Sequence, residues 1–213
     1  YYSEYVLEER MAKNTKNVMI FLDGLIEKVK PVAKNEFNLL EDYAKSIDNI
    51  DSLKKWDISF YSEMYKKHKY NVDQEELKPY FSLANVLNGV FEISNKLYGL
   101  KFKKISNVDT YNNEVNTYEV KDEKNNFVAL LYTDFHPREG KRGGAWMTSY
   151  KSQYILKKNN QRPHISIVCN FTRPIKEKPS LLTFNEVTTL FHEFGHALHG
   201  ILANTKFKSL SGT

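Results

Sequence analysis

The sequence contains little cysteine and no long apolar segment. Cys169 is its single cysteine in 213 residues, which excludes an internal disulfide and any cluster of several thiolates. The longest apolar runs, such as 18–22 and 127–132, are much shorter than the roughly 18 to 20 residues that a membrane-spanning helix needs. We therefore predict a chain that is stabilised by packing or by a metal and that has no membrane partner.

A recognisable leader is also missing. The chain opens Tyr1-Tyr2-Ser3-Glu4, without a Met, a basic stretch or an apolar stretch. A signal peptide is therefore either absent or removed together with other upstream sequence. Because one free cysteine is compatible with a reducing compartment, we expect a cytoplasmic location.

Neither sign of charge dominates the chain. The sequence has 31 Lys and Arg against 26 Asp and Glu, for a net charge of +5 and an isoelectric point near 9.0. The basic residues are scattered among the acidic ones, which indicates a solvated surface and no nucleic-acid partner.

The composition is that of a folded protein. Hydrophobic residues make up 41%, charged residues 27% and aromatic residues 14%, which argues against disorder. We find no internal repeat and no linker, and we therefore expect one domain over residues 1–213, with no separate second domain.

Residues 1–99 show the periodicity of helices. Apolar residues between 18 and 29 recur every three or four positions, as on one face of an amphipathic helix. Pro31 fits the first turn of a second helix, where its missing N–H does no harm. Ser82 is a suitable N-cap for a further helix, and Gly99 suits its C-terminal end. The expected core face of that helix consists of Leu83, Val86, Leu87, Val90, Phe91, Ser94 and Leu97.

Residues 100–170 are expected to form strands and loops. The segments 114–121 and 127–135 are rich in β-branched and aromatic residues and flank a polar turn, which predicts a β-hairpin. Residues 137–144 read as a loop, and 165–169 as a buried strand. The fold class is therefore predicted to be mainly α with a small β-sheet.

A well-defined final helix is predicted over about 183–203. Thr183 and Glu186 form a capping box, and Leu182 and Val187 are spaced as a hydrophobic staple. This helix contains the sequence His-Glu-x-x-His at 192–196.

The spacing of His192 and His196 predicts a metal site. Four residues advance a helix by about 400° and 6 Å, so both imidazoles project from nearly one face and can bind one Zn²⁺. Glu193 can hold a water at the metal and is the candidate general base. The alternative is an amphipathic helix with two chance histidines, a pattern that a chain of this length shows by accident about 1% of the time.

Two neighbours on the same helix need separate interpretation. His199 lies about 7 to 8 Å along the axis from the midpoint of the histidine pair, too far for a third ligand of one tetrahedral ion. Support of the site or a hydrogen bond on the helix surface is the favoured role. Gly195 disfavours the helix, so we expect a strand, a substrate or another helix to approach the backbone there.

Other residues carry groups that could bind a ligand or act in catalysis. The stretch 140–144 lacks the glycine and hydroxyl spacing of a phosphate loop and is better interpreted as a loop that leads into an edge strand. Arg138 and Arg142 suit a peptide carboxylate or, more simply, surface salt bridges. Cys169 is interpreted as a small buried hydrophobic residue, not a nucleophile.

Several motifs together resemble those of one enzyme family. The chain is similar to the thimet-oligopeptidase-like zinc metallopeptidases and, within them, to the bacterial peptidyl-dipeptidases. The matching stretches include LEERMAK (7–13), LKPYF (77–81), YTDFHPREGKRGGAW (132–146), RPH (162–164), PSLLTF (179–184), HEFGHALHG (192–200) and SLSGT (209–213).

This resemblance implies a zincin-like catalytic-domain fragment with its His-Glu-x-x-His helix near the C-terminus. His192 and His196 would bind zinc, and Glu193 would be catalytic. The third ligand would be a glutamate beyond Thr213, so the rest of the parent polypeptide is an expected partner and this chain alone is expected to be inactive. Gly143 to Ala145 would leave room for a substrate backbone to pair with the sheet, and an ordinary turn is the alternative interpretation of these residues.

The resemblance further implies hydrolysis of short peptides with release of C-terminal dipeptides. An endo-acting oligopeptidase with the same site is one alternative. The other is a zinc-binding structural fragment without catalysis.

Overall fold

The computed structural model describes residues 1–10, 12–71 and 73–212. The chain divides into two compact units, Tyr1–Val72 and Asp73–Thr213. The expected single domain over residues 1–213 stays a prediction. The described residues include no helix long and apolar enough to cross a bilayer.

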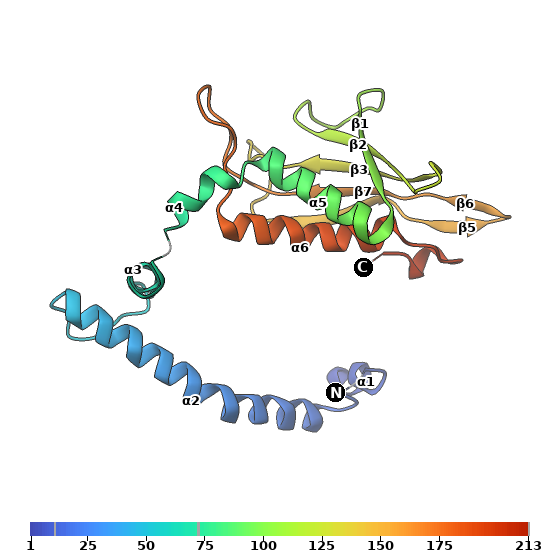
Figure 1. Cartoon of the computed structure of the whole chain (residues 1–213). Helices are drawn as coiled ribbons and strands as arrows, with labels where there is room; N and C mark the ends of the chain where they lie inside the picture. The colour runs from blue at the N-terminus through green and yellow to red at the C-terminus, as the bar shows by residue number, and fades with distance from the viewer. Residues whose placement is uncertain (11, 72, 213) are drawn as a thin grey trace. The chain divides into compact units, whose positions relative to one another are not determined.

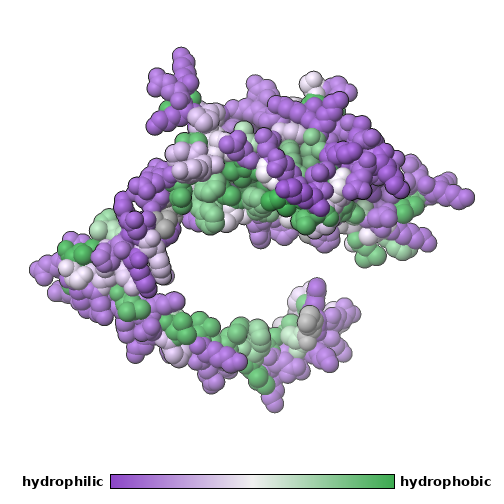
Figure 2. Space-filling model, in the orientation of Figure 1, coloured by the Kyte–Doolittle hydropathy of each residue, from purple (hydrophilic) through white to green (hydrophobic). Residues whose placement is uncertain are grey.

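The first unit is helical. It contains α1 (Tyr2–Glu8), α2 (Thr15–Ile47) and α3 (Ile58–Tyr70). Its small core consists of Leu40, Ala44, Leu53 and Tyr61. Much of the apolar surface of α2 is exposed, as Figure 2 shows; the exposed residues include Met19, Ile20, Phe21, Leu25, Ile26, Val29 and Val32.

The prediction that Pro31 begins a second helix is wrong, because α2 runs through it as one helix of 33 residues. An internal proline removes one N–H and costs about 3 kcal/mol, but the effect is local. Residues on both sides continue the helical hydrogen bonding, and the Asn14 side chain caps the start by accepting from the Asn17 N–H at 2.9 Å.

The second unit combines helices with a mixed sheet (Figure 1). Its helices are α4 (Gln74–Leu77), the 3₁₀ turn η1 (Lys78–Tyr80), α5 (Leu83–Tyr98), α6 (Phe184–Ile201) and the 3₁₀ turn η2 (Lys208–Leu210). Its strands are β1 (Lys101–Ile105), β2 (Asn116–Lys121), β3 (Phe127–Asp134), β4 (Trp146–Lys151), β5 (Tyr154–Leu156), β6 (Asn159–Gln161) and β7 (His164–Val168). The predicted class, mainly helical with a small sheet, is confirmed.

The main sheet has the strand order β1-β2-β3-β7-β4. The β3–β7 pair is parallel and the other pairs are antiparallel. The predicted hairpin is confirmed as β2 and β3, and its turn is closed by Asn126, whose N–H donates to Asp122 Oδ1 at 2.8 Å. The predicted buried strand is β7, and β4 is the edge strand that follows the predicted loop.

Helix α5 begins and ends as predicted. The Ser82 hydroxyl accepts from the Asn85 N–H at 3.3 Å, and Gly99 is left-handed with φ of 67°. The prediction that Leu97 lies in the core is wrong, because its side chain is 66% exposed. Spacing placed Leu97 near the core face, but it lies in the last turn, beyond the part of α5 that packs against the sheet.

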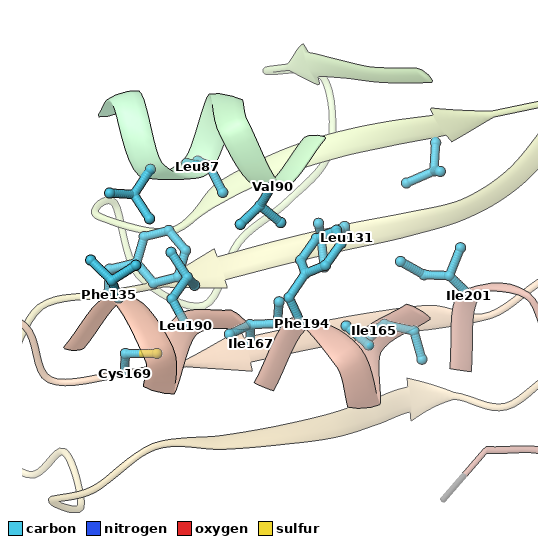
Figure 3. Packing of buried hydrophobic residues seen from close by; sticks show 14 of the residues in the cluster. Leu87, Val90, Leu131, Phe135, Ile165, Ile167, Cys169, Leu190, Phe194 and Ile201 are labelled. Carbon is cyan, nitrogen blue, oxygen red and sulfur yellow. The ribbon is translucent and has the colours of Figure 1, made fainter. Parts of the chain in front are cut away.

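The core of the second unit lies between the sheet and the two helices α5 and α6. Figure 3 shows Leu87 and Val90 of α5, Leu131 of β3 and Phe194 of α6 among its side chains. The strands contribute Ala129 and Leu131 of β3 and Ile165 and Ile167 of β7 to this core, and Thr133, which shares their face by alternation, is buried as well. The consequence for function is that α6 is held firmly along β7 and β4.

Candidate active site

The start of α6 is built from local hydrogen bonds. The Glu186 N–H donates to Thr183 Oγ1 at 3.2 Å, and the Thr183 N–H donates to Glu186 Oε2 at 2.8 Å. Leu182 and Val187, the predicted staple pair, are both buried in the core. The capping box that the sequence predicted is therefore confirmed.

The two faces of α6 differ in burial. Leu190, Phe194, Ala197 and Ile201 are at most 3% exposed and face the sheet. The opposite side exposes His192, Gly195, His196 and His199. The apolar contacts thus fix the rotation of the helix and present its histidines to the outside.

The C-terminal end of α6 is anchored by Arg162. Its guanidinium donates to the main-chain oxygens of Ile201 at 2.7 Å, Ala203 at 2.9 Å and Val128 at 2.7 Å. A cation at a helix C-terminus satisfies free carbonyls and interacts favourably with the helix dipole. Arg162 therefore ties the helix end to β3.

His192 and His196 converge as their spacing predicts. Their Nε2 atoms are 3.2 Å apart, and their ring centroids are 4.8 Å apart with planes at 86°. Two nitrogen ligands of a tetrahedral zinc ion, each at 2.0 to 2.1 Å, are about 3.3 to 3.4 Å apart. The pair therefore fits one zinc ion with little movement, although the same distance also permits a hydrogen bond between the two rings.

Glu193 occupies a different environment from the histidines. Its side chain is buried, at 8% exposed, whereas both histidines are exposed. It is close enough to Cys169 to influence that thiol: burial, with a further contribution from the Glu193 charge, raises the pKa of Cys169 to about 12. Cys169 is therefore a neutral buried thiol, which confirms its interpretation as a small hydrophobic residue.

The described residues contain no set of three or more His, Cys, Asp or Glu side chains that could hold a metal ion. His199 is exposed one turn beyond His196 and does not join the pair. Within the described part of the chain, α6 therefore offers two imidazole ligands to a zinc ion.

Neither a strand nor a helix of the described residues approaches Gly195, and the third expected possibility, a substrate, stays a prediction. A Cβ built on Gly195 would have no atom of the described residues within 4 Å. The close contact occurs at Gly200, where a Cβ would lie 2.7 Å from Cδ1 of Ile165. Near its C-terminal end, α6 therefore lies close to Ile165 of β7, whereas no described atom lies close to the backbone at Gly195 beside the histidines.

We expect opposite stability effects from alanine at these two glycines. Gly200→Ala should lower Tm, because overpacking against the buried Ile165 costs about 1–3 kcal/mol and exceeds the helix-propensity gain. Gly195→Ala, the matched control, should raise Tm slightly because it gains up to about 1 kcal/mol without a contact. Thermal unfolding of both variants measures this, and a higher Tm for Gly200→Ala would contradict the packing.

A charge network lies where β3 ends. Arg138 donates to both carboxylate oxygens of Asp134, at 2.7 and 2.9 Å, and Tyr111 donates to Oδ2 at 2.8 Å. Burial raises the pKa of Asp134, but hydrogen bonds from Arg138, Lys141 and Tyr111 outweigh this and bring it to about 2. Arg138 is therefore engaged in an ion pair, the simpler of its two predicted roles.

The edge of the sheet beside α6 is hollowed. A cavity of about 250 Å³ is lined by Met147, Thr148 and Ser149 of β4, by Gly200 of α6, and by Ser152, Pro163, Ile165, Ser211 and Gly212. An edge strand with free backbone groups and space beside it can accept a further strand.

The chain is similar in sequence to several named peptidases. Oligopeptidase A of Salmonella typhimurium is 39% identical over 212 residues, which are 99% of this chain and 31% of that protein. Dipeptidyl carboxypeptidase of Escherichia coli is 36% identical over 214 residues, 100% of this chain and 31% of that protein. Saccharolysin of Saccharomyces cerevisiae is 33% identical over 227 residues, which cover 99% of this chain and 32% of that protein.

The chain thus spans about a third of the length of these curated relatives. The profile of Peptidase family M3 matches residues 1–213. The resemblance to oligopeptidases and peptidyl-dipeptidases that the motifs indicated is confirmed, and the chain belongs to peptidase family M3.

Proposed function

We propose that His192 and His196 hold a catalytic Zn²⁺ and that the full-length protein hydrolyses short peptides, releasing C-terminal dipeptides. The observation that carries the metal assignment is the 3.2 Å separation of the two Nε2 atoms on the exposed face of α6. Membership of a peptidase family supports the reaction class.

The roles of the residues follow from their chemistry. When bound, zinc supplies a Lewis acid that polarises a peptide carbonyl and lowers the pKa of water to about 7. The carboxylate of Glu193 takes a proton from the attacking water and passes it to the leaving amine. Because Glu193 directly follows His192 on a helix fixed by its buried face, its position is set by the same packing.

We further propose that the full-length protein supplies a third, carboxylate ligand. Catalytic zinc sites generally have three protein ligands, and the described residues bring together two. The substrate would lie along β4 and the loop before it, where β4 has no outer partner strand among the described residues and α6 packs alongside.

Zinc binding is expected to depend on His196 and not on His199. In the full-length protein, His196→Ala should lose most of its zinc after dialysis, because a single remaining imidazole on α6 cannot form the two-nitrogen site. His199→Ala is the matched control, an exposed histidine on the same helix, and should keep stoichiometric zinc. Elemental analysis measures both, and near-stoichiometric zinc in His196→Ala would contradict the assignment.

An endo-acting oligopeptidase is the second candidate, supported by the 39% identity to proteins named oligopeptidase A. Product analysis on one peptide with a free C-terminal carboxyl group and on its amidated form separates the two candidates. Release of the terminal dipeptide only from the free form supports the dipeptidase. Equal internal cleavage of both forms supports the endopeptidase.

A further inference from the structure

The loop between β3 and β4 leads directly into β4, an edge strand of the sheet in the part of the chain that the structure describes. It contains Gly140, Gly143 and Gly144, and Gly144 has φ of 94°, a conformation that favours glycine. Gly143 and Gly144 are exposed, and a Cβ built on either would have no described atom within 4 Å. Such a loop is open to a ligand, but its glycines make it costly to order.

Asn170 holds this loop from the neighbouring strand. It lies two residues after β7 ends, and its Nδ2 donates to the main-chain oxygens of Arg142 at 3.0 Å and Gly144 at 2.7 Å. One side-chain amide thus binds two carbonyls of the loop, one on each side of Gly143.

Lys141 holds the same loop from inside. Its side chain is only 4% exposed, and its ammonium donates to the main-chain oxygens of Asp134, His136 and Cys169 and to Asp134 Oδ1, at 2.6 to 3.0 Å. Because Cys169 and Asn170 are consecutive, the end of β7 fixes the loop at two points. At the first point, the buried ammonium of Lys141 donates to the Cys169 carbonyl. At the second, the exposed amide of Asn170 donates to two carbonyls of the loop.

We propose that Asn170 is a positioning residue for the peptide substrate. With Lys141 it holds residues 140–145 in one conformation, so that the loop and the first residues of β4 are ready to receive a peptide backbone. This inference rests on the proposed function. A preformed site avoids the entropy cost of ordering a glycine-containing loop on binding. Loss of the Asn170 hydrogen bonds should therefore weaken substrate binding more than it slows the chemical step.

The test uses the zinc-loaded full-length enzyme and an internally quenched fluorescent peptide. Asn170→Ala should raise KM about tenfold and change kcat less than about threefold. Asn170→Asp keeps the size but loses the donor and places a carboxylate against two carbonyl oxygens, so its KM should rise at least as much. Because the contacts of Asn170 are exposed, both variants should retain Tm and zinc content.

Asn126→Ala is the matched control. Its side-chain amide also donates a hydrogen bond in a surface turn of the same sheet, from Nδ2 to Asp122 Oδ2 at 2.8 Å, but the turn lies at the opposite end of β3. Its KM should equal that of the unmodified enzyme. Hydrogen–deuterium exchange of residues 140–146 reports on the loop directly and should be faster in both Asn170 variants than in the control.

The outcomes separate this inference from the function it rests on. Faster loop exchange with an unchanged KM would overturn the positioning role, as would normal kinetics of Asn170→Asp, which would show that only side-chain size matters. A fall in kcat with an unchanged KM would also overturn it. Absence of hydrolysis by the unmodified enzyme would instead contradict the proposed function itself.

Discussion

Glu193→Gln in the full-length enzyme is expected to lower kcat by roughly 100-fold or more while zinc stays bound. The amide has nearly the shape of the carboxylate but cannot accept the proton of the attacking water. Since Glu193 is 8% exposed and packed on a helix whose apolar face is buried, replacement of its charge by a neutral side chain of equal size should preserve the fold.

Steady-state hydrolysis of a fluorescent peptide measures this loss, and elemental analysis of the same sample shows whether zinc remains. Glu92→Gln is the matched control, because it makes the same chemical change at an exposed position on α5. Near-normal turnover of Glu193→Gln would show that another group is the base. Loss of zinc together with activity would mean that Glu193 supports the metal instead.

The 213-residue chain by itself is expected to be inactive as a peptidase and to hold zinc more weakly than the full-length protein. Within the described residues, His192 and His196 are the two side chains that converge, and no set of three metal-binding side chains is present. Absence of a carboxylate ligand lowers the binding free energy and leaves the attacking water poorly oriented.

The measurement compares the zinc-saturated chain with a version extended by roughly 30 residues, a length that can carry a third ligand in zinc hydrolases. Competition with a chromophoric chelator gives the zinc affinity of each. A His192→Ala, His196→Ala double variant corrects for non-specific zinc.

Chelator-sensitive turnover of the short chain equal to that of the extended one would contradict the prediction and show a third ligand within the chain. Zinc binding without turnover in the full-length protein would favour the non-catalytic alternative.

The features that the sequence predicts correctly are encoded within short stretches of chain. The capping box of Thr183 and Glu186, the hairpin of β2 and β3 and the convergence of His192 with His196 depend on residues close in sequence. Helical and strand periodicity and local hydrogen bonds are enough to predict them. The family motifs added the reaction class.

Short strands and the course of α2 could not be predicted in this way. Strands β1, β5 and β6 are three to five residues long and carry weak alternation, so pairing with neighbours decides them. Pro31 is tolerated inside α2 because one lost hydrogen bond is small beside those that continue on both sides.

The residues that support the candidate site are set by contacts between segments that are distant in the sequence. Asn170 and Lys141 bind carbonyls 26 to 28 residues away in the sequence, and Arg162 binds those of Ile201 and Ala203, 39 and 41 residues away. Main-chain carbonyls are chemically alike at every position, so no residue type or spacing marks such partners. They become partners only when the parallel pairing of β3 with β7 and the packing of α6 bring distant segments together.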